Sequence, residues 1–200
     1  LHDMWGFCGA EHISYDNRWN KGYLKSNRPI GEGRIDLNRW TWRRKRKYWK
    51  NPINIITPSD WMKQNVKKSY LMKDWPVYSI SNAIDIKKWK PIDKNSSRKT
   101  LKLPNELSLI LFGSTSGTKD YHKGFDLLEK SLEKLQNLNK KIGLVIFGED
   151  EPKIKPNFKF PIFYLGFLQN SKSLIAAYSA ADLVLIPSRV ESFGQVASEA

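Results

Sequence analysis

The chain has 200 residues, of which 40% are hydrophobic and 27% charged, and a formal net charge of +14. Its single cysteine, Cys8, excludes an intramolecular disulfide and a cysteine-ligated zinc cluster, which fits a reducing compartment. No signal peptide is visible, and no apolar run reaches the length of about 18 residues that a membrane-spanning helix needs.

The positive charge lies almost entirely in the first half of the chain. Residues 1–100 contain 22 Lys and Arg against 9 Asp and Glu, net +13, whereas residues 101–200 contain 12 against 11, net +1. All eight tryptophans also lie in the first half. This asymmetry indicates two domains with different partners.

The densest basic run, Arg43–Lys50, is interleaved with Trp and Tyr. Three interpretations stay open at this point. The run suits an anionic membrane surface, because Trp and Tyr favour the headgroup level, and it also suits nucleic acid. It is equally consistent with a solvated helix face whose tryptophans pack in the core.

A strand–helix–strand order is predicted after this run. Asn54–Thr57 is predicted as a short buried strand that ends at Pro58, Ser59 as the N-cap of a helix that ends at about Lys68, and Pro76–Ile80 as the next strand. This order is typical of a doubly wound α/β domain.

A polar stretch without periodicity predicts an interdomain linker at residues 93–104, which assigns residues 1–92 to a first domain and residues 105–200 to a second. The second domain is predicted to contain four parallel strands and two helices in the order strand, helix, strand, strand, helix, strand. The strands are expected at residues 107–113, 144–148, 162–166 and 183–186, and the helices after Gly124 and at residues 173–180. In the first helix, an apolar stripe at a spacing of three or four residues is predicted to face the core, formed by Phe125, Leu128, Leu132 and Leu135.

Residues at the predicted strand ends suit a phosphate ligand. Gly113 and Ser114 offer backbone N–H groups at the end of the first strand of the second domain. Lys123 lies at a loop-to-helix junction, where its ammonium group can neutralise a departing diphosphate.

The last twenty residues contain the most informative pattern. A buried parallel strand is predicted at residues 181–188, and two carboxylates, Glu191 and Glu199, then flank seven residues that include the turn Ser192–Gly194. A helix that begins near this turn favours phosphate through its free N–H groups and its dipole. The Glu199 carboxylate accepts hydrogen bonds from hydroxyl groups and does not bind phosphate. The pattern therefore predicts a ligand with both groups, such as a nucleotide sugar.

This Glu-x7-Glu pattern, with an internal Phe-Gly and an upstream Pro-Ser, resembles the group 1 (family 4) retaining glycosyltransferases of the GT-B fold. The resemblance implies that Glu191 faces the donor sugar, that Glu199 holds the ribose, and that Ser192, Phe193 and Gly194 lie under the diphosphate. It also implies an α/β fold of two Rossmann-like domains with parallel sheets and a donor site in the cleft. Such an enzyme is longer than this chain, which we therefore expect to be a fragment that lacks both ends.

The first residues, Leu1–Trp5, resemble a Leu-His-Asp-Met-Trp signature of one subgroup, in which the histidine contacts the donor sugar. The resemblance makes His2 a candidate catalytic residue together with Lys123 and Glu191. The subgroup has several cysteines just downstream that this chain lacks. Ser81–Asp85 resembles the family's Asn-Gly-Ile-Asp stretch at the exit of the first domain, with Ala83 in place of the glycine.

In the family an arginine about six residues before the phosphate-binding lysine often shares its task. None is present here, and Lys119 or Arg189 is the candidate substitute. Backbone around residues 147–149 and 166–168 is expected to line the pocket of the nucleotide base.

The resemblance implies a retaining glycosyltransferase that moves a sugar from a nucleotide-sugar donor to a saccharide or lipid-linked acceptor in cell-surface polysaccharide synthesis, such as lipopolysaccharide. We expect no metal or other cofactor, because the sequence contains no Asp-x-Asp motif and no His/Asp cluster. We expect a cytoplasmic enzyme, with Arg43–Lys50 as its contact to the inner membrane face.

Two other functions are alternatives to a glycosyltransferase. One is a nucleotide-sugar epimerase of the same fold, against which the Glu-x7-Glu spacing argues. The other is a basic nucleic-acid-binding protein, against which the near-neutral second half argues, so no nucleic-acid partner is expected.

Overall fold

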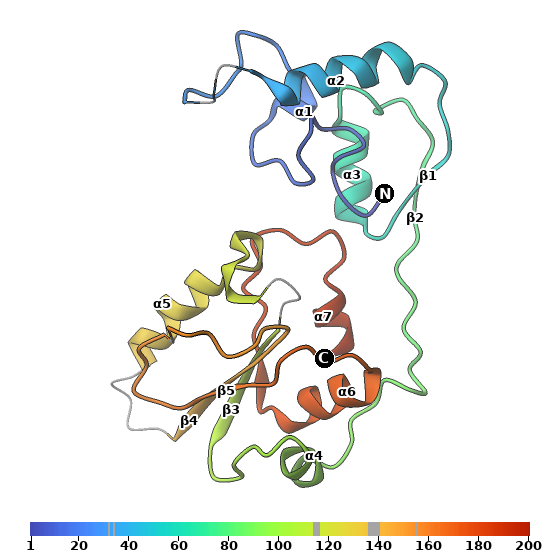
Figure 1. The fold of residues 1–200 in the computed structure, drawn as a ribbon. Helices are drawn as coiled ribbons and strands as arrows, with labels where there is room; N and C mark the ends of the chain where they lie inside the picture. Colours follow the sequence, from blue (N-terminus) through green and yellow to red (C-terminus); the bar gives the residue numbers. More distant parts are fainter. Residues whose placement is uncertain (32, 34, 114–116, 136–140, 155) are drawn as a thin grey trace. The chain divides into compact units, whose positions relative to one another are not determined.

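The computed structural model divides the chain into two compact units, Leu1–Ala83 and Ile84–Ala200, which we call unit 1 and unit 2 (Figure 1). Both units contain a parallel sheet, which confirms the predicted α/β fold class. No helix in the described part of the chain is long and apolar enough to cross a membrane. The structure describes residues 1–31, 33, 35–113, 117–135, 141–154 and 156–200.

Unit 1 has a short parallel sheet with helices around it. Strands β1 (Ile55–Thr57) and β2 (Val77–Ser79) pair in parallel, and helix α3 (Asp60–Lys68) connects them. The predicted N-cap is confirmed, because the Ser59 hydroxyl accepts a hydrogen bond from the Met62 amide at 3.2 Å. The remaining helices of this unit are α1 (Arg18–Lys21) and α2 (Leu37–Tyr48).

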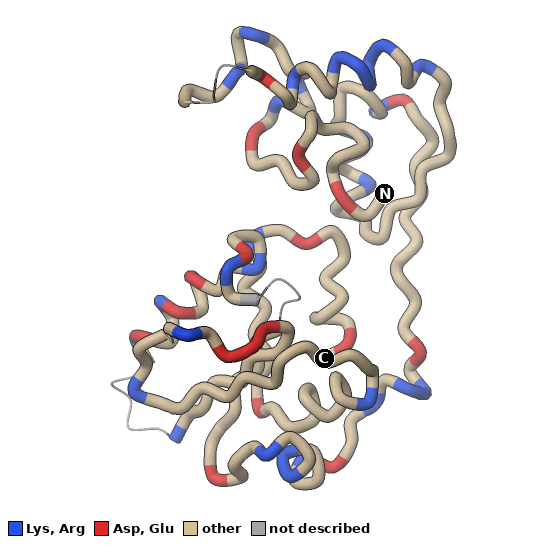
Figure 2. The backbone as a smooth tube through the Cα atoms, viewed as in Figure 1, with Lys and Arg blue, Asp and Glu red and all other residues tan. Residues whose placement is uncertain are grey.

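Helix α2 carries most of the basic run and has one buried face. Trp42 is 1% exposed and contacts the rings of Tyr23 and Tyr70, with centroids 5.8 and 5.3 Å away. Lys45 lies on the same inward face and is also buried, so one of the six basic residues of Arg43–Lys50 does not face solvent. The other cations of the run are exposed, and Figure 2 shows where Lys and Arg lie along this part of the chain.

Unit 2 has a four-stranded parallel sheet with the order β5-β4-β3-β6. Helix α5 packs on one face of the sheet through Phe125, Leu128 and Leu132, the apolar stripe that the sequence predicts. Helix α6 packs on the other face through Ala177 and Ala180. The elements are α4 (Lys94–Thr100), β3 (Ser108–Gly113), η1 (Gly117–Lys119), η2 (Tyr121–Lys123), α5 (Phe125–Leu135), β4 (Ile142–Phe147), β5 (Ile162–Tyr164), α6 (Ser171–Ala180), β6 (Leu183–Val184) and α7 (Gln195–Glu199).

The structure differs from the linker predicted at residues 93–104, because helix α4 occupies most of it and belongs to unit 2. The Asp93 carboxylate caps this helix at the Ser96 amide. Arg98 is 3% exposed and donates to the Ala180 carbonyl and the Asp182 carboxylate at 2.9 and 2.7 Å. A buried arginine therefore anchors a segment whose polar composition is typical of a linker.

Strand β6 is shorter and less buried than the sequence predicts. It spans two residues at the edge of the described sheet, with β3 as its neighbour, and Leu183 is 49% exposed. The loop that follows it carries the residues of the candidate site.

Candidate functional site

The carboxyl-terminal side of the sheet in unit 2 brings two distant loops into contact. The first loop ends with η2 and the turn Lys123-Gly124, and the second follows β6. Gly124 has a left-handed φ of 68°, and a Cβ there would lie 2.2 Å from the Pro187 carbonyl oxygen. Glycine is therefore required both by backbone conformation and by this close approach.

Lys123 and Glu191, two of the predicted catalytic residues, meet at this point. The Lys123 Nζ donates to the Glu191 Oε1 at 2.7 Å across 68 residues of sequence. Their side chains are 26% and 28% exposed, so solvent reaches both partners. The pair is a charge-assisted hydrogen bond that an incoming anion can compete for.

Arg189 holds the two loops together. Its guanidinium forms two hydrogen bonds of 2.7 Å with the Asp126 carboxylate and stacks 3.9 Å from the Tyr121 ring centre. The guanidinium lowers the pKa of Asp126 below its ordinary value. Arg189 thus positions these loops through Asp126, and its role as a substitute for the missing arginine stays a prediction. Lys119, the other candidate, is exposed.

Glu199 is the last residue of α7. The helix follows its N-cap residue Gly194, which has a left-handed φ of 82°. The two carboxylate oxygens of Glu199 accept hydrogen bonds from the Tyr178 hydroxyl at 3.1 Å and the Gln195 amide at 2.9 Å. Burial, followed by the nearby carboxylate, raises the pKa of Tyr178, which keeps its hydroxyl a donor. Sequence analysis missed Tyr178, since nothing in its helix distinguishes it from a core aromatic residue.

The turn between the carboxylates has the predicted form. Ser192 and Phe193 are half-buried, Gly194 is buried, and α7 follows directly. The N-cap residue of α7 is Gly194, which has no side chain to cap the first amide groups of the helix.

Gly113 ends β3 under the Phe147 ring. A Cβ at Gly113 would lie 1.9 Å from a ring carbon, so a larger residue does not fit there. Ser114 lies outside the described residues. The two segments expected to line a base pocket are neighbours, because the Gly148 amide donates to the Gly166 carbonyl at 2.8 Å.

In unit 1, His2 is exposed, and in the loop that follows it the Asp3 carboxylate lies 2.6 Å from the His12 Nδ1. Lys45 holds this loop in place. Its Nζ donates to the carbonyl groups of Trp5, Cys8 and Gly9, the last two at 3.1 and 2.7 Å. Burial lowers the pKa of Lys45 to about 8. No local pattern marks Lys45 for this role, because it resembles its basic neighbours in the sequence.

Comparisons with known proteins identify the family of the chain. The model of the family "Glycosyl transferases group 1" matches residues 93–200. An uncharacterised glycosyltransferase of Methanocaldococcus jannaschii is 29% identical over 158 residues, which cover 73% of this chain and 39% of that protein. A glycogen synthase of Chlorobium chlorochromatii is 31% identical over 156 residues, which cover 66% of this chain and 31% of that protein.

A sucrose-phosphate synthase from Thermosynechococcus elongatus has a similar solved structure. Its TM-score is 0.62 at 19% identity, over 85% of this chain and 43% of that one, and the likeness shows the GT-B type of α/β fold. The chain spans 31% to 39% of the length of the two curated relatives. Because the family model matches more than half of its residues, the chain belongs to the group 1 glycosyl transferases.

Proposed function

We propose that the protein is a retaining glycosyltransferase that transfers a sugar from a nucleotide-sugar donor to a saccharide or lipid-linked acceptor. The observation that carries the proposal is the Lys123–Glu191 pair, which joins a cation and a carboxylate at the carboxyl-terminal side of a parallel sheet. Open parallel α/β sheets bind their ligands on that side.

Lys123 would stabilise the leaving diphosphate. The donor's phosphate competes with Glu191 for the ammonium group, and the competition grows as the glycosidic bond breaks and negative charge collects on the phosphate. The turn Ser192–Gly194 and the backbone of Gly113 and Ser114 would add N–H donors to the same group.

Glu191, once displaced from Lys123, is free to accept hydrogen bonds from the donor sugar, and His2 is the candidate from unit 1 for the same end. Glu199 would hold the ribose hydroxyls, oriented by Tyr178 and Gln195. In this arrangement Glu191 and His2 contact the sugar end of the donor, and Lys123 and Glu199 contact its nucleotide end.

The class of acceptor is inferred from two features of unit 1. These are the subgroup resemblance of Leu1–Trp5 and the excess of positive charge. We assign the reaction to cell-surface polysaccharide synthesis, on the cytoplasmic side of the membrane, with the exposed part of Arg43–Lys50 as the contact to anionic lipid. Lys45 is left out of this contact because it is buried.

A donor panel tests the proposal. Calorimetry with the intact protein should find one nucleotide sugar that binds more tightly than its free sugar or free phosphate. Proton NMR of the product should show the anomeric configuration of the donor. An inverted product would refute the retaining mechanism, and a panel with no binding donor would refute the transferase itself.

A further inference from the structure

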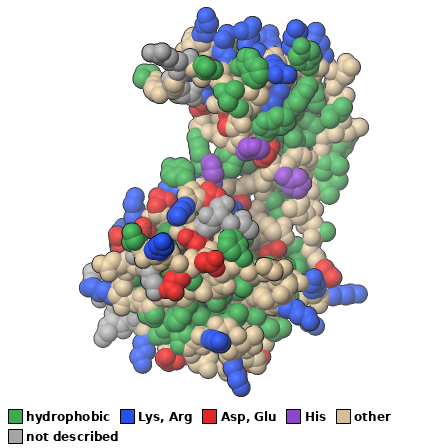
Figure 3. All heavy atoms as spheres, in the orientation of Figure 1, with side chains coloured by type: hydrophobic (Ala, Val, Ile, Leu, Met, Phe, Trp, Pro, Cys, Tyr) green, Lys and Arg blue, Asp and Glu red, His purple; other side chains and the backbone are tan. Residues whose placement is uncertain are grey.

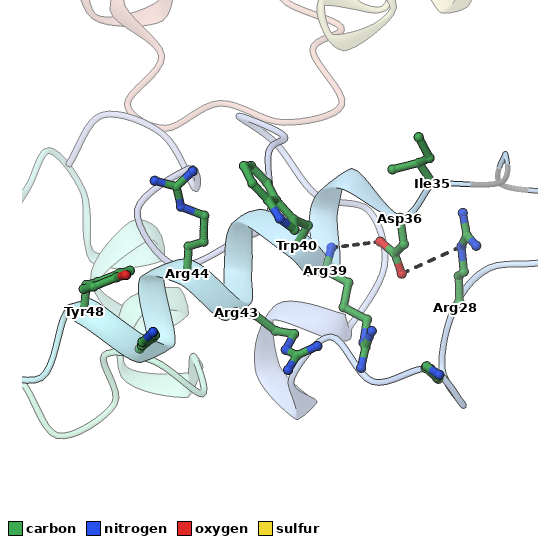
Figure 4. Close-up of a pocket in the computed structure, with 10 residues that line it drawn as sticks. Arg28, Ile35, Asp36, Arg39, Trp40, Arg43, Arg44 and Tyr48 are labelled. Carbon is green, nitrogen blue, oxygen red and sulfur yellow. Dashed lines mark hydrogen bonds and ion pairs between the residues drawn. The ribbon is translucent and has the colours of Figure 1, made fainter.

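The outward side of α2 forms one wall of a cationic groove of about 1010 Å³ (Figure 4). Arg39, Arg43 and Lys47 are spaced four residues apart and so form one row along the helix. Trp40, Arg44 and Tyr48 form the adjoining row, in which the Arg44 guanidinium lies 4.8 Å from the Trp40 ring centre. Lys25 and Arg28 line the groove from the segment before α2.

Among the described residues, six cations and one carboxylate, Asp36, line the groove. Asp36 is already committed, since it caps α2 at the Arg39 amide and lies 3.7 Å from a nitrogen of Arg28 and from one of Arg18. Within the described residues, neither Arg43 nor Lys47 forms an ion pair. Figure 3 shows Lys and Arg side chains gathered over this part of unit 1. The groove therefore favours an anion with more than one negative charge.

An apolar pocket of about 360 Å³ adjoins the groove at Tyr48, which lines both. Its buried side chains are those of Ile55, Met72 and Trp75, each at most 8% exposed. Its exposed residues include Ile53, at 64%. Trp5 and Trp49 are also exposed, and together with Ile53 they form what we call the rim of the pocket. The volume lies within the range of about 300–1,000 Å³ in which proteins enclose small ligands.

The rim of the pocket is fixed before any ligand arrives. The Lys45 Nζ lies 3.9 Å from the Trp5 ring centre and 5.7 Å from that of Trp49, and the two rings meet edge to face at 5.8 Å. Lys45 donates hydrogen bonds to the carbonyl groups of Trp5, Cys8 and Gly9. These bonds hold this segment, which we call the Trp5 loop, against α2. A preformed rim reduces the ordering cost of binding.

We propose that unit 1 binds a lipid phosphate, with the phosphate in the cationic groove and the hydrocarbon chain in the tryptophan-lined pocket. A phosphate alone would use the groove and leave the pocket empty, whereas a neutral lipid would use the pocket and leave the cations without a partner. An anionic amphiphile satisfies both surfaces at once. The assignment of this ligand as the acceptor rests on the proposed function, but its binding does not.

Binding of farnesyl phosphate to the intact protein, below its micellar concentration, tests the site by calorimetry. It should bind at least tenfold more tightly than inorganic phosphate, because each buried methylene of the chain adds to the affinity. It should also bind more tightly than farnesol, since the cations contribute only to the phosphate.

Two variants separate the groove from the pocket. Arg43→Ala/Lys47→Ala should weaken farnesyl phosphate and inorganic phosphate alike, by tenfold or more. Ile53→Ser should weaken farnesyl phosphate severalfold and leave inorganic phosphate unchanged. The charge-matched control Lys68→Ala/Lys73→Ala removes two exposed lysines outside the groove and should change neither affinity.

Lys123→Ala distinguishes this site from the donor site. It should lower kcat by roughly 10²–10³ and leave farnesyl phosphate binding intact, so each proposal can fail without the other. Equal affinity for farnesyl phosphate and inorganic phosphate would overturn the lipid assignment, as would full farnesyl phosphate affinity in both Ile53→Ser and Arg43→Ala/Lys47→Ala.

Discussion

Lys123 carries the clearest prediction at the scale of single residues. If its ammonium group stabilises the leaving diphosphate, Lys123→Ala should lower kcat by roughly 10²–10³, the effect of losing one strong electrostatic contact in the transition state. Lys123→Arg should restore part of the rate, because guanidinium and ammonium differ in shape. Steady-state kinetics measures both, with exposed Lys134→Ala as the control, and full activity in Lys123→Ala would exclude the role.

Glu199 should act on binding of the nucleotide. Glu199→Ala removes hydrogen bonds from the carboxylate to the ribose and should weaken nucleoside diphosphate and nucleotide sugar alike, by about 1–3 kcal/mol. Calorimetry compares the variant with Glu133→Ala, which removes an exposed carboxylate from α5. Unchanged affinity in Glu199→Ala would show that the carboxylate does not hold the ribose and contacts only Tyr178 and Gln195.

Replacing Lys45 should destabilise the protein, whereas replacing Lys47 on the same helix should not. Lys45→Met leaves buried carbonyl groups of the Trp5 loop without a donor and should lower the free energy of unfolding by about 1–3 kcal/mol. Lys47→Met removes an exposed lysine and should change it by less than about 0.5 kcal/mol. Urea denaturation followed by tryptophan fluorescence checks the pair, and equal midpoints would contradict the buried role of Lys45.

At the scale of elements, the two loops of the candidate site should loosen in acid. Arg189 lowers the pKa of Asp126, so the stability that this carboxylate contributes is complete above its ordinary pKa of about 3.9 and is lost as the pH falls through its lowered value. Asp126→Asn lacks this titration. Its stability should therefore fall less than that of the wild type between pH 5 and pH 2, and parallel pH profiles in denaturation experiments would argue against the ion pair.

Helix α2 should bring the protein to anionic membranes. Five of the six cations of Arg43–Lys50 are exposed, and each contributes about 1 kcal/mol near such a surface. Co-sedimentation should occur with anionic vesicles, disappear with neutral ones, and decrease at high salt. The variant Arg43→Ala/Arg46→Ala/Lys50→Ala should bind less than Lys87→Ala/Lys88→Ala/Lys90→Ala, and equal recovery with both lipids would leave the run a solvated helix face.

The elements themselves show where sequence patterns suffice. The apolar stripe of α5 and the capping serine of α3 follow local rules of spacing and hydrogen bonding, and both predictions are confirmed. Helix α4 is not predicted, because Arg98, which anchors it, reaches beyond nearby carbonyl groups to Ala180 and Asp182, more than 80 residues away in sequence. No local pattern contains such a partner.

At the scale of the whole molecule, the sequence determined the fold class, the family and most of the candidate donor residues, because strand periodicity and the Glu-x7-Glu spacing are local properties. Their functional roles stay predictions. The boundary between the units and the engagement of Arg189 by Asp126 were decided by the tertiary structure alone.

The same division explains the basic run. Its composition is visible in the sequence, but one cation faces inward onto backbone carbonyl groups while its neighbours line a groove beside an apolar pocket. Whether a side chain is buried, and which residues surround it, depends on how distant parts of the chain pack together. Residues that are distant in sequence leave no local pattern that predicts their contact. The sequence by itself therefore determined which charges and rings unit 1 contains, and only the tertiary structure decided which of them are available to a ligand.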